Sequence, residues 1–215
     1  MKALPAATAL LAALLACGCA SPGWEKTESV PGGKLYVPKV YAPLLPGSIY
    51  PDKKTPVPAK GRPAIVVVCP AKGDCREKEI LERAAQRGLV VLVGREPKSD
   101  LLRTRAEADA ERIGWLLVSP TGDFLRGWRE QSAAGGPIAV LLPAKRTSAA
   151  GAEPPKPSAL SPFRKFLFAA SPDSAPSTLP GGAVLKLYSP DGKGLLPDEA
   201  YRDAVEWLAG ALEVH

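Results

Sequence analysis

The chain has 215 residues, 46% of them apolar and 23% charged, which is enough for one globular domain with a modest core. After the first 20 residues, no apolar stretch reaches the roughly 20 residues of a membrane-spanning helix, so a bundle of such helices is excluded. The formal net charge of +6 comes from basic residues interspersed with acidic ones, and this argues against a nucleic-acid partner.

Residues 1–16 have the form of a secretory signal peptide. A short basic start is followed by an uncharged run, rich in leucine and alanine, from Leu4 to Ala16. The run ends in Leu14-Leu15-Ala16-Cys17, which resembles the bacterial lipobox because a small residue precedes the cysteine and an apolar residue stands three positions before it. The resemblance implies that Cys17 is lipidated, with Cys19 as the alternative.

The residue after Cys17 also bears on location. Inner-membrane lipoproteins carry an aspartate at this position, whereas this chain has Gly18. In this respect the chain is similar to outer-membrane lipoproteins. We therefore expect a lipid-anchored protein of the bacterial outer membrane that faces the periplasm or is exposed at the surface. The expected partners are the membrane and an unknown ligand or envelope protein. Ordinary signal cleavage after Ala20 is the alternative.

The predicted elements begin with residues 17–60, which we expect to hold the anchor, a tether and edge strands at 34–37 and 40–41. The main domain is expected over 61–215. The β-branched run Ala64–Val68 is typical of a strand buried on both faces of a parallel sheet, and Leu89–Val93 has the same character. Between them, residues 77–87 show helical spacing.

The second half of the domain continues the alternation of strands and helices, although the patterns are weaker. The pattern predicts a helix over 101–118, a weak strand over 124–128, a short helix that includes 138–142, a long loop over 145–162, strands at 166–169 and 183–188, and a last helix from about Pro197. This order predicts an α/β fold, a three-layer α/β/α sandwich with a mostly parallel sheet. Ligands bind beyond the carboxyl ends of such strands, so the candidate loops are 69–76, 94–100, 129–136, 170–176 and 189–196.

Two cysteines, Cys69 and Cys75, lie within the domain. An exported protein meets an oxidising compartment, so the pair is a candidate disulfide, with two buried thiols as an equal alternative. The single histidine, His215, is the last residue, which argues against zinc enzymes and an ordinary Ser-His-Asp triad. We expect no metal site and no cofactor.

Several local motifs resemble the α/β-hydrolase superfamily, closest to its dienelactone-hydrolase-like branch, over roughly residues 33–212. The segment 131–139 is similar to the nucleophile turn, Ser171-Pro172-Asp173 follows a strand where the family carries its acid, and Tyr188–Leu196 resembles the loop of the catalytic histidine. The resemblance implies a reduced α/β-hydrolase fold with catalytic positions Ser132, Asp173 and Lys193. Lys193 stands where the family has its histidine.

Each active-site motif departs from the family pattern. Glu130 takes the place of the first glycine of G-x-S-x-G, Pro70 cannot donate an oxyanion hydrogen bond, and lysine is protonated near neutral pH unless burial lowers its pKa. We therefore predict a non-catalytic pseudoenzyme that binds a ligand or partner. The alternative is an esterase-like serine hydrolase that uses Ser132 with Lys193, and a third hypothesis is a structural envelope protein. A buried Lys193 would support the hydrolase and a solvent-facing Lys193 would argue against it.

Overall fold

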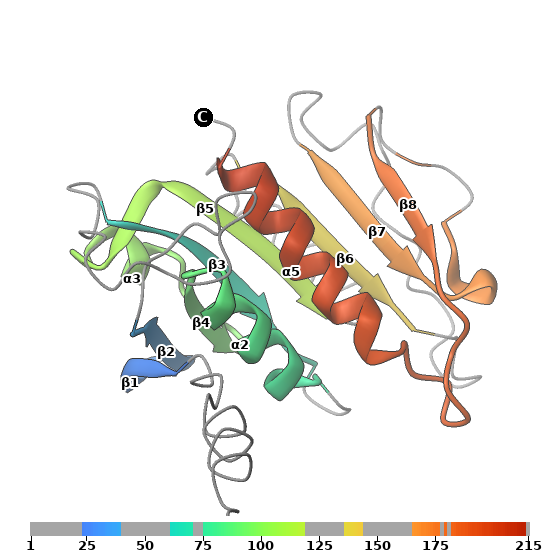
Figure 1. Cartoon of the computed structure of the whole chain (residues 1–215), viewed down its shortest axis with the longest axis horizontal. Coiled ribbons are helices and arrows are strands. Elements are labelled where there is room, and N and C mark those ends of the chain that lie inside the picture. The colour runs from blue at the N-terminus through green and yellow to red at the C-terminus, as the bar shows by residue number, and fades with distance from the viewer. Residues whose placement is uncertain are drawn as a thin grey trace, which may run out of the picture.

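The computed structural model describes residues 23–39, 61–70, 75–118, 136–143, 165–176, 179 and 182–213. Their strands form a single eight-stranded sheet (Figure 1). The strands are β1 (Trp24–Val30), β2 (Gly33–Pro38), β3 (Arg62–Val68), β4 (Val90–Gly94), β5 (Ala108–Val118), β6 (Ile138–Leu142), β7 (Phe166–Ala170) and β8 (Val184–Leu187).

The strand order in the sheet is β1-β2-β4-β3-β5-β6-β7-β8. β2 runs antiparallel to both of its neighbours, and all pairs from β4 to β8 are parallel. The helices are α2 (Glu77–Gln86), α3 (Asp100–Arg103), the 3₁₀ turn η2 (Pro172–Ser174) and α5 (Asp198–Glu213). The predicted α/β class with a mostly parallel sheet is confirmed.

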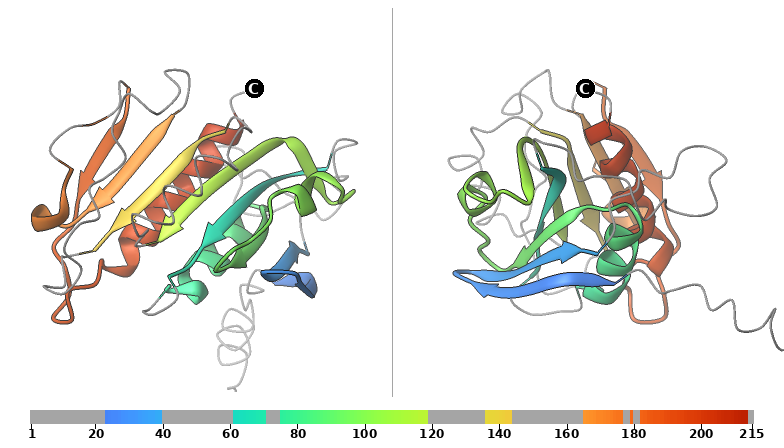
Figure 2. Two further views of the ribbon diagram at one scale, coloured as in Figure 1. Left: turned by 180° about the vertical axis from the view of Figure 1, so that it is seen from behind. Right: turned by 60° about the vertical axis from the view of Figure 1, so that its left-hand side comes forward.

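Helices cover both faces of the sheet (Figure 2). On one face α2 and α5 pack against each other and bury one set of alternating strand residues, which includes Ile65 and Val67. The other set, which includes Val66 and Val68, lies in a second core together with Leu102 of α3. Because β3 is buried on both faces, its sequence is a continuous β-branched run. None of the helices in the described segments is long and apolar enough to cross a membrane.

The sequence predicted several elements correctly. The helix predicted at 77–87 is α2, and the predicted last helix is α5. The strands predicted at 34–37, 64–68, 89–93, 166–169 and 183–188 correspond to β2, β3, β4, β7 and β8. The strands predicted at 40–41 and 124–128 and the loop at 145–162 lie outside the described residues.

The predicted helix over 101–118 is wrong. The segment forms the short helix α3 and then the eleven-residue strand β5, which pairs with β3 and β6 at the centre of the sheet. The run Ile113–Val118 is apolar on every side, so it suits a strand buried on both faces as well as a buried helix. At Gly114 a Cβ would lie 3.1 Å from the Leu208 side chain of α5, so the glycine lets this helix lie close to the strand.

The predicted short helix at 138–142 is also wrong, because these residues form β6. The five residues Ile-Ala-Val-Leu-Leu carry no periodicity that separates a helix turn from a buried strand. This correction changes one candidate loop. Gly136, the last residue of 129–136, leads into β6 at its amino end, where Trp115 pairs with Ile138.

Candidate functional site

Four described segments gather at one edge of the sheet. They follow β3 (69–70 and 75–76), β4 (95–99), β7 (171–176) and β8 (188–197). Parallel strands end at the same edge, and ligands of such sheets bind there. We refer to these four segments as the carboxyl edge.

A disulfide bond fixes the segment after β3. It joins Cys69 and Cys75, whose Cα atoms are 5.4 Å apart. The N–H of Cys69 donates a hydrogen bond to the carbonyl oxygen of Gly94 at 2.8 Å. The disulfide, one of two alternatives that the sequence left open, therefore ties Cys75 to the ends of β3 and β4.

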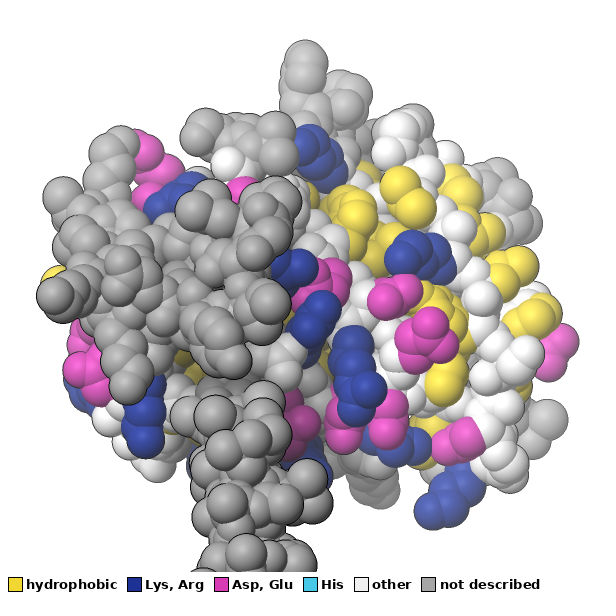
Figure 3. Space-filling model, in the orientation of Figure 1, with side chains coloured by type: hydrophobic (Ala, Val, Ile, Leu, Met, Phe, Trp, Pro, Cys, Tyr) yellow, Lys and Arg dark blue, Asp and Glu magenta, His cyan; other side chains and the backbone are white. Residues whose placement is uncertain are grey.

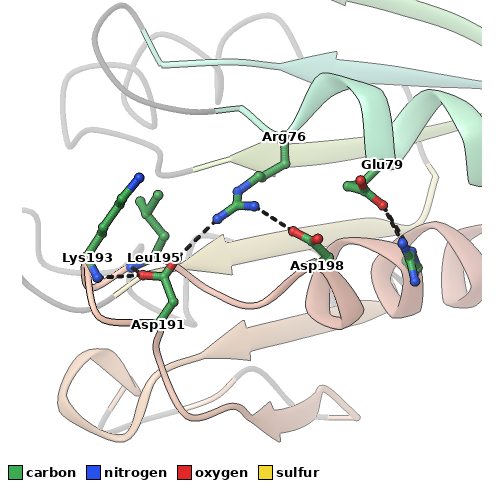
Figure 4. A network of polar contacts seen from close by, with 7 residues as sticks. Arg76, Glu79, Asp191, Lys193, Leu195 and Asp198 are labelled. Carbon is green, nitrogen blue, oxygen red and sulfur yellow. Dashed lines mark hydrogen bonds and ion pairs between the residues drawn. The ribbon is translucent and has the colours of Figure 1, made fainter.

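Arg76, the next residue, connects three elements at the carboxyl edge (Figure 4). Its Nη1 lies 2.7 Å from Asp198 Oδ1 in the first turn of α5, and its Nη2 lies 3.1 Å from Asp191 Oδ2 in the segment after β8. Arg76 has φ 48° and ψ 40°, and among the described residues no other non-glycine residue has a positive φ. We call the ion pairs of Arg76 with Asp191 and Asp198 the Arg76 clamp.

The second oxygen of Asp191 organises the loop after β8. Asp191 Oδ1 accepts hydrogen bonds from the N–H groups of Lys193 and Leu195, each at 2.9 Å. The backbone donor at Leu195, helped by the one at Lys193 and by the Arg76 charge, holds the pKa of Asp191 below its usual value, although burial acts in the other direction. The carboxylate therefore closes this loop and joins it to Arg76.

None of the residues of the Arg76 clamp was predicted from the sequence as a site residue. The motif Asp191-Gly192-Lys193-Gly194 signals a turn, but nothing local in the sequence pairs it with Arg76, which is 115 residues away. The sequence around Arg76 also does not indicate its left-handed conformation, which is uncommon for a residue with a long side chain.

Lys193 and Asp173 are both exposed. Figure 4 shows that the Lys193 side chain extends away from the Asp191 carboxylate, which is bound by the backbone N–H of Lys193 and not by its amine. Asp173 lies in η2, where the hydroxyl groups of Ser171 and Ser174 are 2.8 Å apart and Ser174 donates to the Leu142 carbonyl at 2.6 Å. These bonds fix the turn, and the Asp173 side chain faces solvent.

Ser132 lies outside the described residues. Gly136, four residues later, lies at the amino end of β6, on the side of the sheet opposite the carboxyl edge. The grouping of Ser132 with Asp173 and Lys193 therefore stays a prediction. The hydroxyl residues that follow the carboxyl end of β5 in the sequence are Ser119 and Thr121, and these also lie outside the described residues.

A cleft of about 550 Å³ opens at the carboxyl ends of β3 and β4. Its walls are the turn between β1 and β2, the disulfide, the start of α2 and the residues after β4. The charged side chains in its lining come from Lys34, Glu77, Arg95 and Glu96. Its size is within the usual range of small-molecule sites.

The chemistry of the cleft is polar at the start of α2. Tyr36 donates a hydrogen bond of 2.8 Å to Glu77 Oε1, and burial together with this bond raises the pKa of Tyr36 to about 12. Among the described residues, no group of three or more His, Cys, Asp or Glu side chains could hold a metal ion. The cleft thus offers ammonium, guanidinium and carboxylate groups to a ligand.

Similarity to known proteins is found among solved structures. No protein-family model and no curated protein matches the chain. Among solved structures, the chain is similar to Thermogutta terrifontis esterase 2, in a structure of that enzyme phosphoramylated by tabun. The two are 14% identical, the match covers 89% of this chain and 96% of that chain, and the TM-score is 0.49.

Proposed function

We propose that this chain is a lipid-anchored protein of the bacterial envelope whose α/β-hydrolase-like domain binds a ligand or partner at the carboxyl edge without hydrolysing it. The observation that carries the proposal is the exposure of Lys193. A lysine serves as a general base only where desolvation destabilises its charged form, and an exposed amine remains hydrated. The exposed Lys193 therefore argues against the hydrolase that uses Ser132 with Lys193.

The architecture supports the hydrolase-like part of the proposal. Eight strands form one sheet in which β2 alone runs against the others, and the loop after β8 is at the edge where this fold family carries its histidine. In this chain, Asp191 and Arg76 join that loop to the starts of α2 and α5. The loop that holds the family's histidine position is thus joined to two helices by ion pairs.

The cleft supports the binding part of the proposal. It lies beyond the carboxyl ends of β3 and β4, which is the side on which parallel sheets bind their ligands. Three of its charged residues, Lys34, Arg95 and Glu96, are exposed to solvent and form no ion pair with another described residue. A concave surface of this size that also presents a few polar groups has the general form of a small-molecule site, which favours a binding role.

The proposal is tested on the purified full-length protein in detergent, with circular dichroism to show that each variant is folded. We expect no turnover of a short-chain nitrophenyl ester and no labelling by a fluorophosphonate. Labelling that disappears in Ser132→Ala or Ser119→Ala, together with turnover lost in the same variant, would establish a hydrolase and overturn the proposal.

Native mass spectrometry of the same preparation tests binding. We expect a non-covalent small molecule on the wild-type protein that is lost in Lys34→Glu/Arg95→Glu and retained in Lys193→Glu, which changes a charge outside the cleft. Equal occupancy in both variants would place the ligand elsewhere on the protein and would contradict the cleft as the binding site.

A further inference from the structure

The position of Arg76 depends on a covalent bond outside its own helix. Cys69 is held at the end of β3 by its hydrogen bond to Gly94, and the disulfide fixes Cys75 beside it. Arg76 follows Cys75 directly and precedes the first residue of α2. The disulfide therefore fixes the backbone of Arg76 relative to the sheet, and α2 fixes it on the other side.

The backbone of Arg76 is strained in this position. A left-handed conformation is unfavourable for a residue with a Cβ, and it persists only where the surroundings hold it. Arg76 is the N-cap residue of α2, and its carbonyl oxygen accepts a hydrogen bond of 3.2 Å from the Ile80 N–H. N-cap residues usually have an extended backbone, so the helix does not by itself impose the left-handed conformation. The contacts that hold it include the disulfide on one side and the carboxylates of Asp191 and Asp198 on the other.

From these observations we infer that the Cys69–Cys75 disulfide is a redox switch for the carboxyl edge. With the disulfide formed, the Arg76 clamp holds the loop after β8. With the disulfide reduced, Arg76 relaxes to a right-handed conformation, its guanidinium leaves the two carboxylates, and the loop opens. This inference rests on the proposed function only in taking the carboxyl edge as the binding edge.

The cleft gives a small thiol a path to the disulfide. Cys69 and Cys75 are each only half-buried, and both line the cleft. A dithiol reductant supplies the electrons: its thiolate attacks one sulfur, a mixed disulfide forms, and the other cysteine leaves as a thiolate that takes up a proton. The second thiol of the reductant then displaces the first cysteine, so the reductant becomes a cyclic disulfide and both cysteines become thiols. Two electrons and two protons are transferred in total.

The experiment follows amide hydrogen exchange by nuclear magnetic resonance in the full-length protein, with and without dithiothreitol. The reporters are the N–H groups of Lys193 and Leu195, because both donate to Asp191 Oδ1. We expect both to exchange at least about threefold faster after reduction, while amides in the centre of β4 keep their rates. Alkylation and mass measurement show that Cys69 and Cys75 are reduced.

Variants separate the switch from a general loss of stability. Arg76→Gln, with the disulfide intact, is expected to speed the same two amides. Arg202→Gln is the matched control, because Arg202 also joins α5 to α2, through Glu79 at 2.6 Å, but on the exposed side of the helices. We expect it to leave both amides unchanged.

Two results would overturn the inference. Unchanged rates at Lys193 and Leu195 in protein whose two cysteines are shown to be reduced would mean that the disulfide does not control the loop. Faster exchange throughout β4 and α5 would mean that the disulfide stabilises the whole fold. Neither result depends on ligand binding or on hydrolysis, so the inference and the proposed function can fail separately.

Discussion

At the scale of single residues, glycines decide how closely the strands beside the cleft approach one another. Gly33 of β2 pairs with Gly94 of β4. A Cβ on Gly94 would lie 1.9 Å from the carbonyl oxygen of Gly32, and a Cβ on Gly33 would lie 2.0 Å from that of Val93. Because the contacting atoms belong to the backbone, no side-chain rotation can relieve them. β2 can therefore pair with β4 only because Gly33 and Gly94 have no side chains.

We therefore predict that Gly94→Ala lowers the free energy of unfolding by about 2 kcal/mol, because it forces β2 away from β4. Urea denaturation of the purified protein measures the effect. Gly192→Ala is the matched control, since a Cβ there meets nothing within 4 Å, and it should change stability by less than about 0.5 kcal/mol. Equal effects of the two substitutions would show that the β2–β4 approach does not limit stability.

At the scale of elements, α5 is the part of the structure on which most other elements depend. It packs on β3, β5, β6, β7 and α2. Glu206 of α5 accepts hydrogen bonds from Arg87 after α2, one of them of 2.8 Å to Nε. Figure 3 shows acidic and basic side chains interspersed on the face that these two helices present. These charges serve to join the helices rather than to attract a charged partner.

The other element that needs explanation is β8, which is the last strand of the sheet. Among the described strands it pairs with β7 alone, and Val184 and Leu187 are 43% and 57% exposed. Hydrophobic side chains gather on this side of the molecule in Figure 3. A polar link connects β8 to α5: Asp203 accepts hydrogen bonds from Lys186 Nζ at 2.9 Å and from the Tyr188 hydroxyl at 2.8 Å.

This link predicts a pH dependence. Burial raises the pKa of Asp203, but the hydrogen bonds from Lys186 and Tyr188 lower it more, so it lies below its usual value of 3.8. A carboxyl group with a lower pKa in the folded state than in the unfolded state contributes stability above pH 3.8, and the contribution is lost as the pH falls through the folded pKa.

Asp203→Asn should therefore lower the free energy of unfolding by about 1 kcal/mol at pH 7, and the difference from wild type should shrink below the usual pKa of the carboxyl. Urea denaturation between pH 7 and pH 3 measures this. Asp173→Asn, which removes an exposed carboxylate that has no ion-pair partner among the described residues, is the control. If Asp203→Asn lowers the free energy of unfolding by the same amount at pH 7 and at pH 3, the charge of Asp203 contributes nothing to stability.

At the scale of the whole molecule, the start of β1 and the carboxyl edge lie at opposite ends of the strands. β1 starts at the amino end of the sheet, since Trp24 pairs with Pro38 and β2 runs antiparallel to β4. Five residues separate Cys17 from Gly23, so this chain segment spans at most about 20 Å. With Cys17 lipidated as proposed, the short tether joins the domain at its amino end and leaves the cleft on the opposite side.

The anchor is testable directly. We expect Cys17→Ser to abolish incorporation of labelled palmitate in a bacterial host and to release the protein from the membrane fraction. Cys19→Ser, two residues away, should leave both unchanged, because Ala16 and Cys17 are poor residues for the two outer lipobox positions before Cys19. Loss of the label in Cys19→Ser alone would move the lipidation site to Cys19, and label retained in both would exclude lipidation at either cysteine.

The sequence predicted those elements whose local pattern has a single interpretation. The β-branched run of β3 is buried on both faces of the sheet, and one face of α5 is buried through the stripe Tyr201, Val205, Leu208 and Leu212. The β5 region was predicted as a helix because its apolar residues also fit a helical spacing, and β6 because a short apolar run has no period that separates a helix from a strand. At the candidate site, the resemblance pointed to Lys193 and Asp173, and the structure places both in solvent.

What the sequence determined by itself was the α/β class, a single histidine at the last position, and two cysteines six residues apart, while export and lipidation stay predictions. These depend on composition or on residues near one another in the chain. Only the tertiary structure decided that β5 and β6 complete the sheet, that Lys193 faces solvent, and that Arg76 meets Asp191 and Asp198, 115 and 122 residues later. Such contacts carry no local signal, because their geometry exists only after α2 and α5 have packed together on the sheet.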